Sequence, residues 1–204
     1  MAGGRFISFE GIDGSGKSTQ ARLLAAGLRA TGAEVIETRE PGGAPGAEAI
    51  RRLLVEGDPG RWSPETEALL FTAARRDHLE RTIRPALARG ATVITDRFAD
   101  STRVYQGVAR AGLRPMVDAL HGLAIGIEPD LTLVLDLAPE VALARGLARG
   151  GAEDRFERLG LGFQQRLRAG FLALAAEFPG RCRVVPAAGS AEAVAARVAA
   201  EAGL

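Results

Sequence analysis

One stretch of the sequence decides the fold: Gly11-Ile12-Asp13-Gly14-Ser15-Gly16-Lys17-Ser18, which fits the pattern G-x-x-x-x-G-K-[ST]. Glycines let the backbone wrap closely around a phosphate group, and the helix that follows adds its N-terminal partial positive charge. The composition of the chain gives only about 0.001 matches to this pattern by chance. The segment therefore predicts a loop that binds nucleotide phosphates, with Lys17 on the β- and γ-phosphates and the Ser18 hydroxyl on Mg²⁺.

Short apolar segments alternate with helical ones along the rest of the chain. Strands are expected at Arg5–Glu10, Glu34–Thr38, Ala91–Thr95, Leu131–Leu137 and Arg181–Val185. Strands that are apolar on both faces and separated by helices are typical of a parallel sheet covered on two sides. We therefore predict a three-layer α/β P-loop NTPase fold, with a five-stranded parallel sheet and helices on both faces. The chain is expected to form one domain, 1–204, with a small lid segment at about 145–157.

The longest predicted helix runs from Pro64 toward Arg89, with Ser63 as its N-cap, and Pro85 is expected to kink or break it. In sheets of this kind, ligands bind beyond the carboxyl ends of the strands. Three segments are expected to gather there, residues 11–18, 39–43 and 96–107. The other helices are expected at 18–30, 45–55, 101–107, 114–125, 139–149, 157–177 and 191–202.

Composition excludes several classes of protein. The 204 residues include 26 basic and 25 acidic side chains, which argues against a broad nucleic-acid-binding surface. No apolar run reaches 18 residues, so we expect neither a transmembrane span nor a secretory signal. Cys182 is the only cysteine, which favours a reducing cytoplasm and a buried strand position for this residue.

Two observations narrow the class of phosphate-binding protein. Lys17 is the only lysine, so the guanine-specifying motif N-K-x-D of GTPases is absent. Asp136 ends an apolar strand without a second acid beside it, unlike the acidic pair of motor and AAA-type ATPases. The small-molecule kinases remain.

Four separate motifs, the loop among them, occur in register and together resemble those of the thymidylate kinase family. They are Phe9-Glu10-Gly11 with the loop that follows, Thr38-Arg39-Glu40-Pro41-Gly42-Gly43, Leu70-Phe71-Thr72-Ala73-Ala74-Arg75, and Asp96-Arg97-Phe98 with Ser101 and Tyr105-Gln106-Gly107. The resemblance extends through Pro129–Leu133 and Asp154–Glu157, so it covers nearly the whole chain. It implies the reaction ATP + dTMP → ADP + dTDP with Mg²⁺, and a homodimer.

The resemblance also implies roles for individual residues. Lys17, Arg97, Arg149, Arg155 and Asp13 are the expected catalytic residues, and Ser18 and Asp96 the expected metal ligands. The expected ATP-binding residues are Gly11, Ile12, Asp13, Gly14, Ser15, Gly16, Lys17, Ser18 and Thr19. The expected dTMP-binding residues are Asp13, Arg39, Pro41, Phe71, Arg75, Arg97, Ser101, Thr102, Tyr105 and Gln106.

Part of the acceptor pocket follows from the residues themselves. A thymine ring needs a stacking face, which Phe71 can offer, and a donor for its O4 atom, which Arg75 supplies one helical turn later. Arg97 follows a strand at its carboxyl end, where it can grip the acceptor phosphate. By resemblance, Asp13 meets the sugar 3′-OH, and Tyr105 crowds the 2′ position so that ribose is disfavoured.

Other positions in the motifs carry less defined expectations. Arg39 is expected at the acceptor phosphate, and Glu40 at the metal or at the arginines. Phe98 replaces the tyrosine usual in the family, and Arg103 and Val104 are expected to adjust the pocket wall. The two histidines, His78 and His121, have no metal-ligating partners at useful spacing, so surface or helix-packing roles are expected for both.

Family members place the catalytic arginine either in the phosphate loop or in the lid. The loop here has Gly14 and Ser15 between Asp13 and Gly16, so the chain resembles the bacterial type with lid arginines. We expect Arg149 to be the catalytic arginine, with Arg155 as the next candidate and Arg145 near the adenine or in solvent.

Two other functions fit the same motifs. One is a kinase of another nucleoside or nucleoside monophosphate on this fold, which a panel of acceptors distinguishes. The other is a non-catalytic nucleotide-binding regulator, which would bind ATP without turning over any acceptor.

Overall fold

The computed structural model of the chain describes residues 4–56, 60–110, 112–149 and 160–204, without the side chains of 109, 110 and 146–149. The strands in these ranges pair in parallel in the order β2-β3-β1-β4-β5, which confirms the predicted five-stranded parallel sheet. Every predicted strand boundary lies within one residue of the observed one. The strands are β1 (Phe6–Glu10), β2 (Val35–Arg39), β3 (Thr92–Asp96), β4 (Leu131–Asp136) and β5 (Cys182–Pro186).

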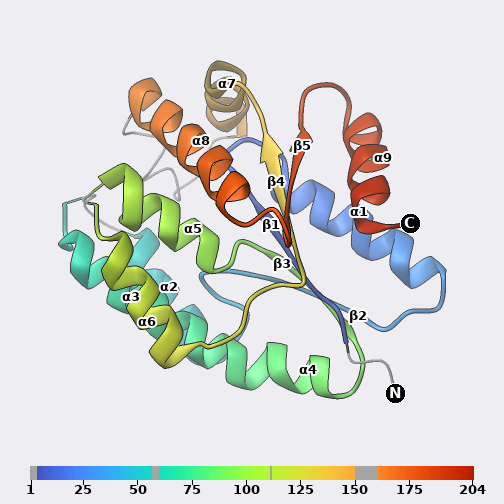
Figure 1. Ribbon diagram of the computed structural model, residues 1–204, viewed down its shortest axis with the longest axis horizontal. Coiled ribbons are helices and arrows are strands. Elements are labelled where there is room, and N and C mark those ends of the chain that lie inside the picture. The colour runs from blue at the N-terminus through green and yellow to red at the C-terminus, as the bar shows by residue number, and fades with distance from the viewer. Residues whose placement is uncertain (1–3, 57–59, 111, 150–159) are drawn as a thin grey trace.

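Helices cover both faces of the sheet, as predicted (Figure 1). On one face lie α1 (Lys17–Ala30) and α9 (Ala191–Ala202), which pack against each other. The opposite face carries α3 (Pro64–His78), α4 (Arg84–Ala88), α5 (Ala99–Val104), α6 (Arg114–Ala124) and α8 (Gly160–Glu177), and α2 (Pro45–Val55) packs against α3. Helix α7 (Pro139–Arg149) lies above the carboxyl ends of the strands.

The long helix predicted to begin at Pro64 is interrupted just before Pro85, as expected. Ser63 caps its start, since the Ser63 hydroxyl accepts a hydrogen bond from the Thr66 N–H at 3.2 Å. A π-helical turn, η1 (Leu79–Ile83), then separates α3 from α4. Pro85 lacks an N–H group and its ring crowds the carbonyl four residues earlier, and the wider turn before it relieves this conflict. A second π-helical segment, η2 (Tyr105–Arg110), likewise continues α5.

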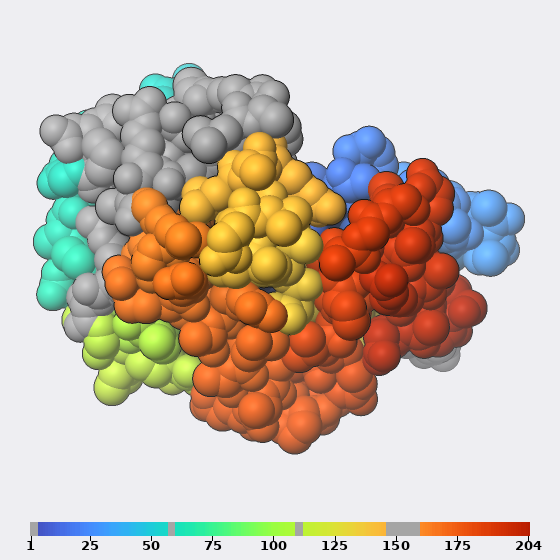
Figure 2. All heavy atoms as spheres, turned by 90° about the horizontal axis from the view of Figure 1, so that it is seen from above, coloured from blue at the N-terminus to red at the C-terminus, as the bar shows by residue number. Residues whose placement is uncertain are grey.

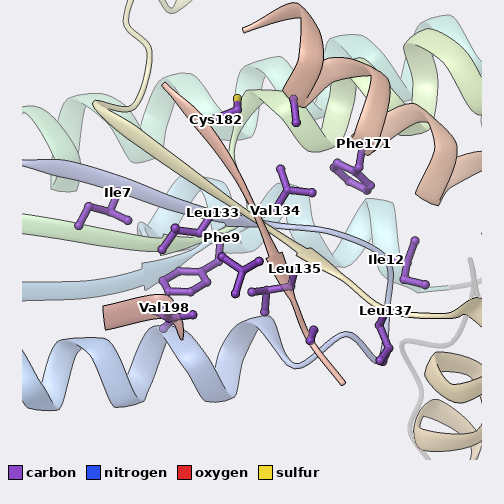
Figure 3. Close-up of a cluster of buried hydrophobic side chains, with 14 of the residues drawn as sticks. Ile7, Phe9, Ile12, Leu133, Val134, Leu135, Leu137, Phe171, Cys182 and Val198 are labelled. Carbon is purple, nitrogen blue, oxygen red and sulfur yellow. The ribbon is translucent and has the colours of Figure 1, made fainter. Parts of the chain in front are cut away.

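The larger hydrophobic core fills the space between the sheet and helices α1, α8 and α9 (Figure 3). Phe9 of β1 and Leu133 of β4 are fully buried within it, and Phe171 of α8 packs on the opposite face from Val198 of α9. Strands β1 and β4 are therefore covered on both faces. The loop that follows β1 is attached to a closely packed part of the core.

A smaller core lies between β1, β3 and helices α4 and α6. Phe98 belongs to it, and its ring meets the ring of Phe6 edge to face with 4.9 Å between centroids. The side chain that departs from the family's usual tyrosine is thus buried in apolar surroundings, where a hydroxyl would need a partner. Cys182 is buried in β5 as predicted, and burial, followed by the charge of Asp100, raises the pKa of its thiol to about 11.

None of the helices in the described ranges is long and apolar enough to cross a lipid bilayer.

Candidate active site

The loop from Gly11 to Ser18 connects β1 to α1 at the carboxyl edge of the sheet, as the motif predicts. Gly14 has a positive φ of 82°, and a Cβ atom at this position would overlap the backbone carbonyl of Ala142 in α7. The glycine therefore serves two needs, a left-handed backbone and close contact with α7. Figure 2 views this edge from above, with α7 (gold) between α8 (orange) and the C-terminal β5–α9 segment (red).

Lys17 is held inside the loop. Its side chain is 6% exposed, and its Nζ atom donates a hydrogen bond to the Ile12 carbonyl at 2.8 Å. Burial first and the positive charge of Arg97 second lower the pKa of Lys17 to about 8, although Asp13 opposes the shift. The ammonium group is thus poorly solvated, and phosphate oxygens could replace the Ile12 carbonyl as its hydrogen-bond acceptors.

Ser18 and Asp96, the predicted metal ligands, are brought together. The Ser18 hydroxyl donates a hydrogen bond to Oδ2 of Asp96 across the space between α1 and β3. The other carboxylate oxygen, Oδ1, is buried and has no hydrogen-bond partner among the described residues. A hydroxyl and a carboxylate with an unused oxygen form a donor set that suits a hard divalent cation.

Arg97 forms the centre of the predicted acceptor-phosphate site. Its backbone has a φ of 72°, a left-handed conformation that a non-glycine residue adopts only when its surroundings hold it there. The guanidinium binds the carboxylate of Asp13, donates to the Ser101 hydroxyl at 2.8 Å, and lies 3.1 Å from the Tyr105 hydroxyl. Tyr105 in turn donates to Asp13 at 2.9 Å, which closes a three-membered cluster.

The charges of this cluster depend on one another. Burial alone would raise the pKa of Asp13, but the charges of Arg97 and Lys17 outweigh it, so the pKa of Asp13 lies below its usual value. Burial would likewise lower the pKa of Arg97, but Tyr105 and Asp13 raise it above its usual value. Asp13 is therefore a carboxylate, and Arg97 and Lys17 provide two cations next to the phosphate-binding loop.

Glu10 holds the turn that carries Arg97, a role that was not predicted from the sequence. Its carboxylate is fully buried and accepts hydrogen bonds from the Phe98 N–H at 2.7 Å and the Ser101 hydroxyl at 2.6 Å. Burial first, and the charge of Asp100 second, raise the pKa of Glu10 to about 7. The available signal was an acid at the end of the apolar strand β1, beside the loop.

The predicted base-binding residues gather on α3 and α5. Arg75 is buried and donates from Nε to Oε2 of Glu40 at 2.6 Å, and from Nη2 to the Phe98 carbonyl and the Thr102 hydroxyl. Within the described part of the chain, its Nη1 group has no hydrogen-bond partner. Phe71, one turn earlier on α3, is partly exposed.

The remaining pocket candidates are placed less directly. Gln106 is buried and donates to Glu67 of α3 at 3.2 Å. Arg39 pairs in register with Asp96 on the sheet, but its exposed guanidinium contacts Glu48 at 3.3 Å. The Pro41 carbonyl accepts a hydrogen bond from Arg51.

Arg103 does not face this pocket, contrary to expectation. Its guanidinium is buried and binds Asp100 of α5 itself, Asp118 of α6 and Glu128 of the loop between α6 and β4, so it ties α5 to these later segments. The histidines also differ from one another: His121 pairs with Glu128 at 3.1 Å, whereas His78 contacts Glu40 of the site. The lid prediction falls largely outside the described residues: α7 ends at Arg149, whose side chain is not described, and Arg155 is not among them.

Comparisons with known proteins identify the family of this chain. The family model described as thymidylate kinase matches residues 9–198. Thymidylate kinases from Dinoroseobacter shibae and Jannaschia sp. are 72% and 68% identical over 89% and 93% of this chain, and over 88% and 91% of theirs. A crystal structure of thymidylate kinase from Ehrlichia chaffeensis superposes with a TM-score of 0.80 at 34% identity, covering 100% of both chains, which confirms the predicted fold. The chain belongs to the thymidylate kinase family.

Proposed function

We propose that this chain transfers the γ-phosphoryl group of ATP to the phosphate of dTMP, giving ADP and dTDP, with Mg²⁺ as its metal ion. Membership of the thymidylate kinase family makes the chain a nucleoside monophosphate kinase that phosphorylates dTMP. The observation that carries the assignment of site residues is the cluster of Lys17, Asp13, Arg97 and Tyr105. It sets two cations where two polyanionic substrates would meet.

Phosphoryl transfer to dTMP requires that the two substrates be aligned and their negative charge be offset, and it requires no general base. An oxygen of the dTMP phosphate is already an anion; it bonds to the γ-phosphorus while the bond to the bridging oxygen of ADP breaks. Arg97 is placed to hold the acceptor phosphate, and Lys17 to bind the β- and γ-phosphates, so both reduce the repulsion between the substrates. The backbone N–H groups of residues 11–19 would bind the rest of the triphosphate.

Ser18 and Asp96 would hold the metal ion. Their oxygens lie within hydrogen-bond distance of each other, and the unpartnered Oδ1 of Asp96 can serve a cation without breaking an existing contact. Bound there, Mg²⁺ supplies positive charge to the phosphate oxygens.

Arg75 and Phe71 would recognise the thymine base. The three contacts of Arg75 fix its plane and leave Nη1 available as a donor to O4. Asp13 would meet the sugar 3′-OH, Tyr105 would bound the 2′ position, and Arg39 would reach the phosphate after leaving Glu48. In the structure, Ser101 and Thr102 contact Arg97 and Arg75, which supports roles in orienting these arginines beside any contact with the base.

The larger organisation is also part of the proposal. We propose a single domain, with a lid segment at about 145–157 that supplies Arg149 and Arg155, and a cytoplasmic location. A homodimer is supported by adjacent helices α3 and α6, which expose Leu69 and Leu123, the latter 88% exposed. Sedimentation at several protein concentrations tests the dimer.

Formation of ADP with a panel of acceptors tests the reaction. We expect dTMP to be strongly preferred over dUMP, UMP, CMP, AMP, GMP and thymidine. The control is Lys17→Ala, which should lose nearly all turnover without a change in melting temperature, because a loop lysine contributes little to the core. Preference for another acceptor would support a different nucleotide kinase, and ATP binding without any turnover would support a non-catalytic regulator.

A further inference from the structure

We propose that His78 is a positioning residue for recognition of the thymine base, acting through Glu40 on Arg75. The proposal rests on the proposed function, because it takes Arg75 as the group that meets the base. It gives His78 a part in substrate selection, where the sequence predicted a surface or helix-packing role.

A chain of hydrogen bonds runs from the sheet to the base pocket. Nε2 of His78 lies 2.7 Å from the Thr38 hydroxyl of β2, and Nδ1 lies 3.0 Å from Oε1 of Glu40. The second oxygen of Glu40, Oε2, accepts the hydrogen bond from Nε of Arg75. Each Glu40 oxygen is thus committed to one partner, and the carboxylate cannot turn without breaking a contact.

Burial makes these contacts costly to lose. The side chain of His78 is fully buried, and Glu40 and Arg75 are 6% and 4% exposed as residues. A buried polar group that loses its partner is left with its desolvation cost and no compensation. Glu40 would then seek a new partner, and the Arg75 plane that it fixes would move with it.

The position of the hydrogen on the imidazole follows from its neighbours. The Glu40 carboxylate can only accept hydrogen bonds, so Nδ1 of His78 must carry a hydrogen. Nε2 faces the Thr38 hydroxyl, which can donate or accept. A substitute must therefore offer a donor toward Glu40 in order to replace His78.

The loop after β2 is shaped around this histidine. Gly43, with a φ of 81°, lies so close that a Cβ atom would overlap both the imidazole and the Thr38 hydroxyl. The Gly43 carbonyl accepts a hydrogen bond from Thr82 at 2.7 Å, which holds the loop in place. The backbone at Gly43 therefore lies directly against the imidazole and the Thr38 hydroxyl, and a side chain at this position would displace them.

The test compares His78→Leu with His78→Asn, whose amide can donate toward Glu40. We expect His78→Leu to raise the KM for dTMP about tenfold and to narrow the dTMP-to-dCMP preference in kcat/KM by a similar factor, with the KM for ATP unchanged. His78→Asn should recover part of both losses. A matched control is His121→Leu, which removes another buried histidine paired with a glutamate and should leave base preference unchanged.

A double-mutant cycle separates positioning from general support. If His78 acts through Arg75, His78→Leu should change base preference little once Arg75→Ala is present, whereas independent effects would add. Unchanged dTMP KM and base preference in folded His78→Leu, or full additivity in the cycle, would overturn the proposal. If His78→Leu does not fold, the same cycle is run with His78→Asn. Failure of the wild-type protein to phosphorylate dTMP would instead refute the proposed function.

Discussion

The hydroxyl oxygen of Tyr105 lies 3.1 Å from Nη2 of Arg97, and both groups bind the carboxylate of Asp13. The guanidinium also sits over the tyrosine ring, with 5.0 Å from its central carbon to the ring centroid. The ring and the hydroxyl of Tyr105 therefore do separate things. The ring fills space and its face stabilises the positive charge of Arg97, while the hydroxyl helps to orient the guanidinium.

Two substitutions separate these roles. Tyr105→Phe removes both hydrogen bonds but keeps the ring, so we expect kcat/KM for dTMP to fall about tenfold while preference over the ribose analogue is retained. Tyr105→Ala should in addition narrow that preference, because the space beside the 2′ carbon opens. Steady-state kinetics with dTMP and its ribose analogue measure both effects. An unchanged sugar preference in Tyr105→Ala would remove this residue from the sugar site.

Glu10 should make stability depend on pH in an unusual direction. Its pKa is about 7 in the folded chain against 4.5 for a free side chain, so the folded state retains a proton that the unfolded state loses between these values. The free energy of unfolding should therefore fall as pH rises from about 4.5 to about 7, by up to roughly 3 kcal/mol from this group. Glu10→Gln should remove this part of the slope.

Urea unfolding at pH 5 to 8 measures the effect. The matched control is Glu177→Gln, an exposed carboxylate on α8, whose pH profile should follow that of the wild type. Parallel profiles for Glu10→Gln and the wild type would show that burial of Glu10 does not perturb its titration.

The lowered pKa of Lys17 leads us to expect that the protein takes up a proton when it binds ATP above pH 8. Its pKa of about 8 means that the ammonium is largely lost by pH 9 in the ATP-free protein, whereas the phosphates of bound ATP favour the charged form. We expect ATP affinity to be roughly tenfold weaker at pH 9 than at pH 7.5. Calorimetry in two buffers of different ionisation enthalpy measures the proton uptake. Lys17→Ala should bind ATP weakly at both pH values, and an equal pH dependence in that variant would assign the proton elsewhere.

The lid prediction concerns the transition state. Gly14 and Ser15 of the loop offer no arginine to the transferring phosphoryl group, so Arg149→Ala should lower kcat by at least about 10², with little change in the KM for dTMP. Arg155→Ala should have the next largest effect. Single-turnover measurements separate this loss from slow product release. If both variants keep more than about half of the wild-type kcat, the charge comes from another residue.

The sequence was sufficient for most of the fold, for reasons that particular segments show. Strands such as Leu131–Asp136 are apolar throughout and bounded by helices, so their positions follow from local pattern. The π-helical turns could not be predicted, because η1 depends on how the helix accommodates Pro85. The ion pairs of Arg103 could not be predicted either, since its partners Asp118 and Glu128 come from a later helix and the loop after it.

The site shows the same division. The motif and the residue spacing were enough to select the phosphate loop, Arg75 and Arg97 as candidate site residues. By contrast, the contacts of Glu10 with Phe98 and Ser101 join residues about ninety positions apart. The hydrogen bonds of His78 could not be predicted either, because its partners Thr38 and Glu40 lie on β2 and just after it, and nothing in its own helix reveals them.

The contact between Gly14 and Ala142 limits how this enzyme could change over evolution. Any residue larger than glycine at position 14 would have to displace the first turns of α7, so a cationic side chain cannot be introduced there by a single substitution. A loop arginine and this placement of α7 are alternative solutions that exclude each other sterically. Converting one into the other would require coordinated changes in two segments more than a hundred residues apart, and an inhibitor that depends on a bare loop would meet few simple routes to resistance at this position.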